Sequence, residues 1–327
     1  MRRFLGLVLV LVLSGSGLAA WWLNQSLTLG APVLDLSVEA GTSPRAVAQA
    51  AVEAGVQTSA LTLYWWFRLS GQARMIKAGS YEIETNTTPR SLLAKLVRGE
   101  ESLRAVTLVE GWSFKQVRAA LSNAEHLTHD TKAFSPDLIM NMLGHPERPA
   151  EGSFYPDTYT YAKGSSDLAL LRRALRAMDK HLAAAWLLRT PDSPLKTPEE
   201  LLTLASIIEK ETGRASDRAM IASVFTNRLN IGMLLQTDPT VIYGLGDKFD
   251  GNLRRRDLLA DTPWNTYTRA GLPPTPIAMP GKPALLAAVQ PASSKALYFV
   301  ARGDGSSQFS DSLDAHNRAV NKYQRGQ

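Results

Sequence analysis

The sequence contains no cysteine. This absence excludes disulfide bonds, thiolate nucleophiles and cysteine-based zinc sites, and it also excludes a lipid anchor on an N-terminal cysteine. Histidine is scarce, and no two histidines form the helical pair with an acid that a catalytic zinc site needs. We therefore expect no metal ion and no other cofactor. The five histidines are His126, His129, His145, His181 and His316.

Strong charge of either sign is also lacking. The formal net charge is +6, and the basic runs at 172–173 and 254–256 are short. A nucleic-acid-binding protein concentrates basic and aromatic residues on one element, so we expect no nucleic-acid partner. A mildly basic surface would suit an anionic cell-wall polymer or a membrane face. With 327 residues, of which 45% are hydrophobic, the chain has room for two folded domains and an anchor.

The N-terminus carries a long uncharged hydrophobic run. Residues 4–23 follow Arg2 and Arg3, and as a helix they would cover about 30 Å, the thickness of a bilayer core. The two arginines favour a cytoplasmic N-terminus, and Trp21 and Trp22 suit a membrane interface. The small residues at 17–20 leave a cleaved signal peptide as the alternative. With either an anchor or a signal peptide, the rest of the chain is exported. We expect the anchor, and therefore a single-pass protein of the cytoplasmic membrane.

Residues 33–84 show a strand–helix–helix–strand pattern. Alternating apolar residues at 33–38 and 80–83 predict strands, and helical patterns open at Ser43-Pro44 and within 61–69. Trp65, Trp66 and Trp112 could stack on sugars in a small glycan-binding module, or they could fill small cores.

A helix over 197–211 carries two candidate acids. Thr197, Pro198 and Glu200 form an N-terminal capping box, and Gly213 is placed to end the helix. Glu209 and Glu211 fall on opposite flanks of its apolar face, so periodicity does not choose between them. The C-terminal helix dipole and partial burial would raise the pKa of either carboxyl toward that of a general acid.

Polar clusters follow this helix at 235–244, 265–267 and 271–277. They combine amide, hydroxyl and phenol groups with a proline-rich loop. Such neutral hydrogen-bonding groups are typical of a carbohydrate cleft, and they are equally typical of long loops.

Taken in order, these motifs resemble the YceG-like (MltG) family of endolytic murein transglycosylases over nearly the whole chain. The segments that carry the resemblance are 151–159, 204–212, 225–229, 235–244, Tyr267 with 271–274, and 298–300. The resemblance implies an α+β protein with three parts. These are a cytoplasmic stub and transmembrane helix (1–24), a small LysM-like βααβ domain (25–103) and a larger α+β catalytic domain (104–327).

The resemblance also implies that Glu211 is the catalytic acid, with the hydroxyl of Thr212 beside it. In the expected reaction Glu211 protonates the glycosidic oxygen between MurNAc and GlcNAc, then takes the proton of the MurNAc 6-hydroxyl, giving a 1,6-anhydro end. One acid suffices because the substrate supplies its own nucleophile. The residues expected to bind the glycan are Gln236, Asp238, Asn265, Tyr267, Glu151 and Tyr155.

Two alternatives remain open from the sequence. A muramidase would pair Glu211 with Asp238 or Asp217 and release a reducing sugar. A non-catalytic scaffold would bind the wall and tether synthesis machinery. The family resemblance favours termination of nascent glycan strands beside peptidoglycan synthases, which are expected partners.

Overall fold

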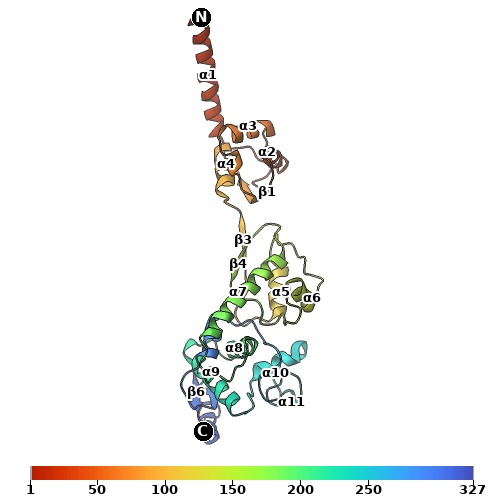
Figure 1. The fold of residues 1–327 in the computed structure, drawn as a ribbon, viewed down its shortest axis with the longest axis vertical. Helices are drawn as coiled ribbons and strands as arrows, with labels where there is room; N and C mark the ends of the chain where they lie inside the picture. The colour runs from red at the N-terminus through yellow and green to blue at the C-terminus, as the bar shows by residue number, and fades with distance from the viewer. Residues whose placement is uncertain (1, 327) are drawn as a thin grey trace. The chain divides into compact units, whose positions relative to one another are not determined.

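The computed structural model of the protein describes the backbone of residues 2–326 and the side chains of residues 13–326. The chain divides into two compact units (Figure 1). The first unit comprises residues 1–104 and 160–164, and the second comprises 105–159 and 165–327. The return of 160–164 to the first unit differs from the expected continuous division at 103/104. Helices and two-stranded sheets make the protein α+β, as predicted.

The first unit is built on an antiparallel pair of strands, β1 (Val33–Val38) and β2 (Gly79–Glu84). Exposed and buried residues alternate along β1, as expected for a sheet with one face on a core. The predicted strand–helix–helix–strand order is confirmed. The helical elements of this unit are α2 (Pro44–Glu53), α3 (Ala60–Leu69), the 3-10 turn η1 (Ala73–Met75) and α4 (Pro89–Arg98).

Local chemistry fixes the ends of these helices. The hydroxyls of Ser43 and Thr88 each accept the N–H of the third residue after them. Pro44 and Pro89 follow at the first helical position, where no N–H is needed. Gly99 ends α4 with φ of 72°, a left-handed conformation that glycine adopts without steric cost.

The tryptophans of α3 lie in different surroundings. Trp66 donates its indole N–H to the carbonyl of Pro89 (3.0 Å) and packs against the core of the unit. Trp65 is 48% exposed, with the guanidinium of Arg68 over its ring. Trp66 is therefore mainly structural, and Trp65 has the exposure that sugar stacking requires.

The N-terminal segment forms the helix α1 (Arg2–Leu23). Its side chains up to residue 12 lie outside the described residues, and with them part of the predicted anchor. Among the described residues, no helix combines the length and apolarity needed to cross a bilayer.

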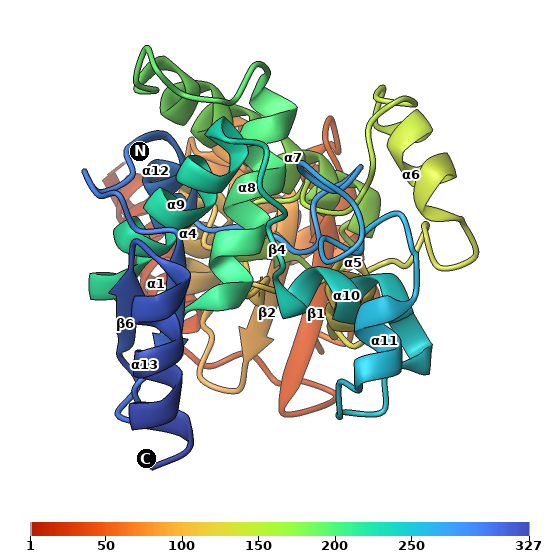
Figure 2. The same ribbon diagram turned by 90° about the horizontal axis from the view of Figure 1, so that it is seen from below.

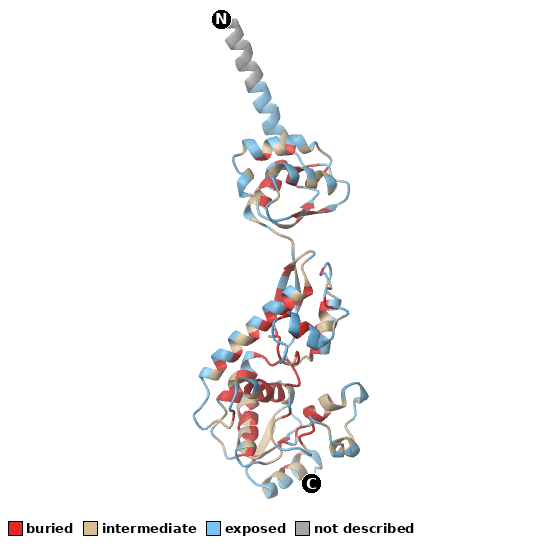
Figure 3. Cartoon of the chain, turned by 45° about the vertical axis from the view of Figure 1, so that its right-hand side comes forward, coloured by how far each residue is buried: buried red, intermediate tan, exposed pale blue. Residues whose placement is uncertain are grey.

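The second unit is largely helical, with a core at the centre of its helices (Figure 3). The division between the units falls within the paired strands β3 (Leu103–Thr107) and β4 (Thr158–Ala162). The helices are α5 (Phe114–Ser122), α6 (Pro136–Met142), α7 (Asp167–Leu187), α8 (Pro198–Glu211), α9 (Ala215–Asn230), α10 (Asp238–Leu245), the 3-10 turn η2 (Gly246–Lys248), α11 (Arg255–Leu259), α12 (Lys282–Val289) and α13 (Leu313–Gln324).

Helix α8 runs through the core of this unit and packs against α7, α9, α10 and α12. Residues 201–208 are buried without exception, so α8 is covered on more faces than its apolar pattern predicts. Its buried polar groups have partners, because Thr203 donates to the carbonyl of Glu199 (2.9 Å) and Ser206 donates to the carbonyl of Thr203 (2.7 Å). This packing gives the end of α8 a fixed position.

The C-terminal part forms a hairpin covered by a helix. Strands β5 (Tyr298–Ala301) and β6 (Ser307–Ser310) pair in antiparallel register, and α13 lies along them (Figure 2). Helix α9 contacts β5 from the core of the unit. The hairpin and α13 therefore stand where they can contribute a wall to a site at the end of α8.

Candidate active site at the end of helix α8

Glu211 is the last residue of α8, and its side chain is largely withdrawn from solvent. The hydroxyl of Thr237 donates a hydrogen bond to Glu211 Oε1. Burial raises the pKa of the Glu211 carboxyl, and the negative charge of Asp238 raises it further, whereas the Thr237 hydrogen bond and the Arg228 guanidinium lower it. The position at the C-terminal end of a helix also disfavours the anion. Glu211 is therefore suited to hold a proton for donation.

The helix ends differently from the sequence prediction. Gly213 does not adopt a left-handed conformation, and α8 stops because Thr212 turns to extended backbone (φ −151°, ψ 132°). The Thr212 hydroxyl then accepts the N–H of Arg214 (2.9 Å). At the other end Thr197 caps the helix as predicted, but Glu200 accepts the N–H of Lys196 rather than that of Thr197.

Glu209 occupies the opposite flank of α8. Its Oε2 accepts the N–H of Gly281 (2.9 Å), and burial raises its pKa as well. It does not line the cleft that contains Glu211. The structure thus separates two acids that helical periodicity left equivalent, and it places only Glu211 in that cleft.

The cleft around Glu211 has a volume of about 570 Å³. One wall is the loop between α9 and α10, with Tyr267 beside it, and the other is formed by β5 and α13. Polar side chains in the lining come from Glu211, Arg228, Gln236, Thr237, Asp238, Tyr267, Tyr298, His316, Asn317 and Gln324.

Two buried threonines, Thr240 and Thr266, hold Thr237, the partner of Glu211, in place. Thr266 accepts the N–H of Thr237 (3.1 Å), and the hydroxyls of Thr240 and Thr266 are 2.9 Å apart. The Thr240 hydroxyl lies 2.7 Å from the carbonyl of Thr237. This network fixes the backbone of Thr237, from which its hydroxyl reaches Glu211. The sequence analysis assigned no role to these threonines, because a hydroxyl within a loop gives no periodic signal.

Gln236 lies in the cleft lining, as an exposed side chain. Its backbone has φ of 50°, a left-handed conformation that a non-glycine residue adopts at some cost. The backbone N–H of Gln236 is fixed by the carbonyl of Thr266 (3.1 Å). The side-chain amide of Gln236 therefore lies in the cleft lining on a fixed backbone, where it can bind a ligand.

Asp238 and Tyr267 also lie together in the cleft. The Tyr267 hydroxyl donates to Asp238 Oδ1 (2.6 Å). Burial raises the pKa of the Tyr267 phenol, and the acceptor bond to Asp238 raises it further, so the phenol stays protonated. The structure brings Gln236, Asp238 and Tyr267 to one cleft with Glu211.

Arg228 is a cation that the sequence analysis did not single out. Its side chain is only 7% exposed and donates to the carbonyls of Leu297 (2.7 Å) and Leu235 (2.6 Å). The guanidinium carbon stands 5.3 Å from the ring centroid of Tyr298. Arg228 thus ties β5 to the loop after α9 and supplies positive potential near Glu211. The family motif at 225–229 contained this residue, but nothing local indicated its role.

Helix α13 contributes His316 and Asn317 to the same cleft, which the sequence analysis also missed. The imidazole of His316 stacks on Tyr298, with centroids 5.2 Å apart. Its Nδ1 is buried, and no hydrogen-bond partner for it occurs within the described part of the chain. Burial lowers the pKa of His316, and nearby Arg228 lowers it further, so the ring is neutral at pH 7.

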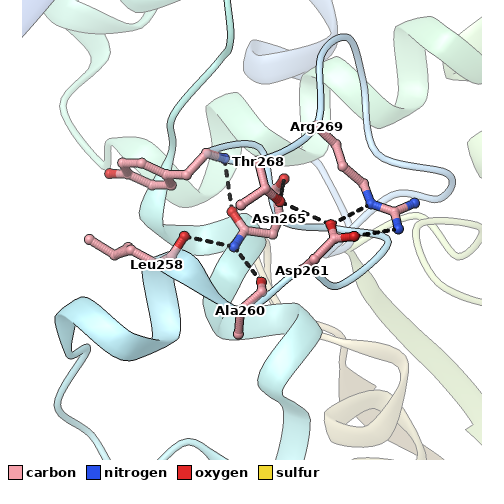
Figure 4. A network of polar contacts seen from close by, with 7 residues as sticks. Leu258, Ala260, Asp261, Asn265, Thr268 and Arg269 are labelled. Atoms are coloured by element: carbon pink, nitrogen blue, oxygen red, sulfur yellow. Dashed lines mark hydrogen bonds and ion pairs between the residues drawn. The ribbon is translucent and has the colours of Figure 1, made fainter.

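The side chain of Asn265 is not placed to bind the glycan, which was its expected role. Its side chain is fully buried, and its amide donates to the carbonyls of Leu258 (3.0 Å) and Ala260 (2.7 Å) (Figure 4). Its Oδ1 accepts the N–H of Tyr267 (2.8 Å). These bonds use the amide's donors and engage its oxygen, so Asn265 shapes the loop that presents Tyr267.

An ion pair supports the same loop. Arg269 makes a two-pronged contact with Asp261, at 2.8 Å and 3.1 Å, and Thr268 donates to the same carboxylate (Figure 4). The loop over 258–269 is therefore held by hydrogen bonds within itself.

Glu151 and Tyr155 lie away from the Glu211 cleft. Glu151 is 9% exposed, its carboxylate accepts the N–H of Phe114 (3.0 Å), and burial raises its pKa to about 7 against the hydrogen bonds that stabilise the anion. The ring of Tyr155 stacks on His181, with centroids 3.9 Å apart, and packs on the core. Tyr155 therefore has a structural role and does not line the Glu211 cleft, contrary to the expectation that it binds substrate there.

The arrangement can perform acid–base chemistry with one protonated carboxyl. Asp238 is the other carboxylate in the lining, whereas Asp217 accepts the N–H of Ser307 (2.8 Å) and does not line the cleft. Within residues 2–326, no group of three or more acidic or histidine side chains is arranged to hold a metal ion.

Known proteins are similar to this chain over most of its length. The chain is 30% identical over 307 residues to the endolytic murein transglycosylase of Bacillus subtilis strain 168, covering 89% of this chain and 84% of that protein. It is 29% identical over 282 residues to the endolytic murein transglycosylase of Streptococcus pneumoniae strain D39, and the matched region covers 50% of that longer protein.

A solved structure is also similar. The crystal structure of a putative YceG-like protein from Listeria monocytogenes matches with a TM-score of 0.57 and 30% identity, covering 88% of this chain and 98% of that one. A model of the YceG-like family matches residues 36–322, which is most of the chain. The protein therefore belongs to the YceG-like family.

Proposed function

We propose that the protein is an endolytic murein transglycosylase, which cleaves peptidoglycan glycan strands internally between MurNAc and GlcNAc. The observation that carries this proposal is the half-buried carboxyl of Glu211, hydrogen-bonded by Thr237 at the end of α8 in a polar cleft. The similarity to the Bacillus subtilis enzyme over most of both chains supports the same activity.

In the first step Glu211 donates its proton to the glycosidic oxygen. The bond between that oxygen and C1 of MurNAc breaks, and the GlcNAc 4-hydroxyl leaves. The raised pKa of Glu211 favours this step, because the acid must enter protonated. The new carboxylate accepts the Thr237 hydrogen bond, which stabilises the charge that has formed.

In the second step the Glu211 carboxylate takes the proton of the MurNAc 6-hydroxyl. The 6-oxygen bonds to C1 and closes a 1,6-anhydro ring, which returns Glu211 to its protonated state. Neither water nor a net proton is consumed. Arg228 and the Tyr267–Asp238 pair set the electrostatic field around this exchange.

A muramidase is the second candidate, because Asp238 shares the cleft with Glu211. In that reaction Asp238 would act as nucleophile or as the base for water. Its hydrogen bond from Tyr267 stabilises the carboxylate that this role needs. The two candidates differ in their products, since hydrolysis leaves reducing MurNAc ends.

We also propose an envelope setting for this activity. Residues 4–23 would anchor the chain in the cytoplasmic membrane with the N-terminus inside, and the βααβ unit would act as a LysM-like glycan-binding module. The sequence of the first helix and the exposed ring of Trp65 support these two proposals. Such tethering would keep the enzyme near nascent strands and near peptidoglycan synthases.

The activity is tested with a matched pair of variants on purified glycan strands, by following strand length. Glu211→Gln should largely stop internal cleavage, because an amide cannot donate and recover the proton. The loss in kcat expected for removal of a general acid is about 10²- to 10⁴-fold. Glu209→Gln, two residues away on the other flank, should retain most of the activity. Equal losses in both variants, or full activity in Glu211→Gln, would contradict the assignment.

A further inference from the structure

A second cleft is lined in part by α8 and α10, the helices that carry Glu211 and Asp238. It has a volume of about 670 Å³, and its lining includes Lys210 and Pro239. Their immediate neighbours in the sequence, Glu211 and Asp238, line the first cleft. The two clefts therefore lie on either side of the end of α8 and the start of α10.

The second cleft combines aromatic and basic groups. Tyr243 and Trp264 pack edge to face, with ring centroids 5.4 Å apart, and both are partly exposed. Aromatic rings of this kind offer an apolar face and a polar edge to a sugar. Lys115 and Lys210 lie in the same lining and are exposed.

The ammonium groups of these lysines have weak or exchangeable partners. Lys210 donates to the carbonyl of Gly111 at 3.3 Å. Lys115 pairs with Asp247, but both side chains are more than three-quarters exposed. Because an exposed ion pair stabilises little, a carboxylate of the substrate can displace Asp247.

Glu151 also lines this cleft and feels the charge of Lys210, but no hydrogen bond or ion pair joins it to either lysine among the described residues. Glu151 is buried, and its carboxylate is engaged by the Phe114 N–H and by Tyr243. Of the two candidate partners for an incoming anion, Lys115 stands on α5 and Lys210 on α8. The exposed part of the cleft therefore presents two lysines and the carboxylate of Asp247 beside aromatic rings.

We propose that this cleft binds a second muramyl unit of the same strand, with Tyr243 and Trp264 against the sugar and Lys115 and Lys210 on its carboxylates. The proposal rests on the proposed function, because internal cleavage requires sugars bound on both sides of the broken bond. The carboxylate can come from the stem peptide or, where the peptide has been removed, from the lactyl group.

The test measures binding rather than cleavage. The full-length chain with Glu211→Gln, in detergent, is titrated with soluble glycan strands in three forms: native, carboxyl-amidated with carbodiimide and ammonia, and amidase-treated. The Lys115→Gln/Lys210→Gln pair is added to this background, and Lys295→Gln serves as the control because Lys295 is exposed and lines neither cleft.

With both lysines present, native strands should bind roughly fivefold more tightly than amidated strands, as expected for two exposed charge contacts. The double variant should bind both forms equally, and Lys295→Gln should keep the preference. Tight binding of amidase-treated strands would assign the carboxylate to the lactyl group, and weak binding would assign it to the peptide.

A double variant that retains the full preference for native strands would overturn the proposal, as would equal weakening with both forms. Failure of the proposed function would look different. The enzyme with Glu211 intact would then leave strand length unchanged, whatever the binding experiment shows.

Discussion

At the scale of single residues, the chemistry depends on the different surroundings of two glutamates on α8, Glu209 and Glu211. Burial raises the pKa of both Glu209 and Glu211. Glu209 is committed to the N–H of Gly281, whereas Glu211 faces the cleft with a hydroxyl donor beside it. The Thr237 hydroxyl can rotate, so it can accommodate both the protonated and the ionised carboxyl. Glu211 can therefore act as acid and then as base.

Removing that donor is expected to change the pH dependence. The Thr237 hydrogen bond lowers the pKa of Glu211, so Thr237→Val should raise it. Because Glu211 must be protonated to donate, the alkaline limb of kcat/KM should move to higher pH. Thr226→Val is the control, since the buried Thr226 hydroxyl has no partner within the described residues. A limb that stays in place in Thr237→Val would contradict the assigned role.

The residues that could be predicted from the sequence are those with a motif or a periodic position. The family motifs indicated Glu211, and the structure places Gln236, Asp238 and Tyr267 in the same cleft. Asn265 was expected to bind the glycan, but its amide bonds backbone carbonyls instead. The sequence of a loop does not distinguish these two roles. Arg228 was missed because its partners are distant in the sequence.

At the scale of elements, Glu151 joins two helices of the second unit. It accepts the first N–H of α5 at Phe114 and contacts Tyr243 on α10. An acid at a helix N-terminus is favoured by the dipole, but burial here outweighs that gain and raises the pKa of Glu151 to about 7. Burial therefore makes the ionised carboxylate less favourable in the folded state than the protonated acid, although both contacts offset part of that cost.

The raised pKa of Glu151 makes the stability of the fold depend on pH. The folded-state pKa of Glu151 lies above its ordinary value of 4.5, so the folded state binds the proton more tightly. Its contribution is fully present below pH 4.5 and is lost as the pH rises through 7, by about 3 kcal/mol at most. In denaturant titrations at several pH values, Glu151→Gln should remove this decline, and Glu147→Gln should not. An unchanged decline in Glu151→Gln would refute the explanation.

Helix starts were predictable because they depend on neighbouring residues. Ser43, Thr88 and Thr197 cap their helices as local chemistry requires. The end of α8 was not predictable in the same way, since the turn at Thr212 puts Glu211 last and makes Gly213 unnecessary as a cap. Burial of α8 on several faces comes from α7, α9 and α12, which no local pattern identifies.

At the scale of the whole molecule, each unit has its own buried cluster. The βααβ order was predicted from short-range patterns, and the α+β class was implied by the family resemblance. The sequence did not predict that the cleft wall comes from β5 and α13, or that residues 160–164 return to the first unit. Both depend on pairing between segments far apart in the chain.

The anchor is a prediction at this scale. The full chain should remain with the membrane fraction after high-salt and carbonate washes and be released by detergent, because about 20 apolar residues suffice to span a bilayer. Deletion of residues 2–24 should release the chain to the soluble fraction. Intact mass of the membrane form distinguishes a retained helix from a cleaved one, and a full chain released by salt alone would contradict the anchor.

The central claim is that Glu211 breaks the glycan without water. The most direct measurement is mass spectrometry of the strand ends produced from purified peptidoglycan in water enriched in ¹⁸O. The account predicts 1,6-anhydroMurNAc ends that contain no ¹⁸O and that are absent with Glu211→Gln. Reducing MurNAc ends carrying ¹⁸O would contradict it and would assign the chemistry to a hydrolase using Asp238.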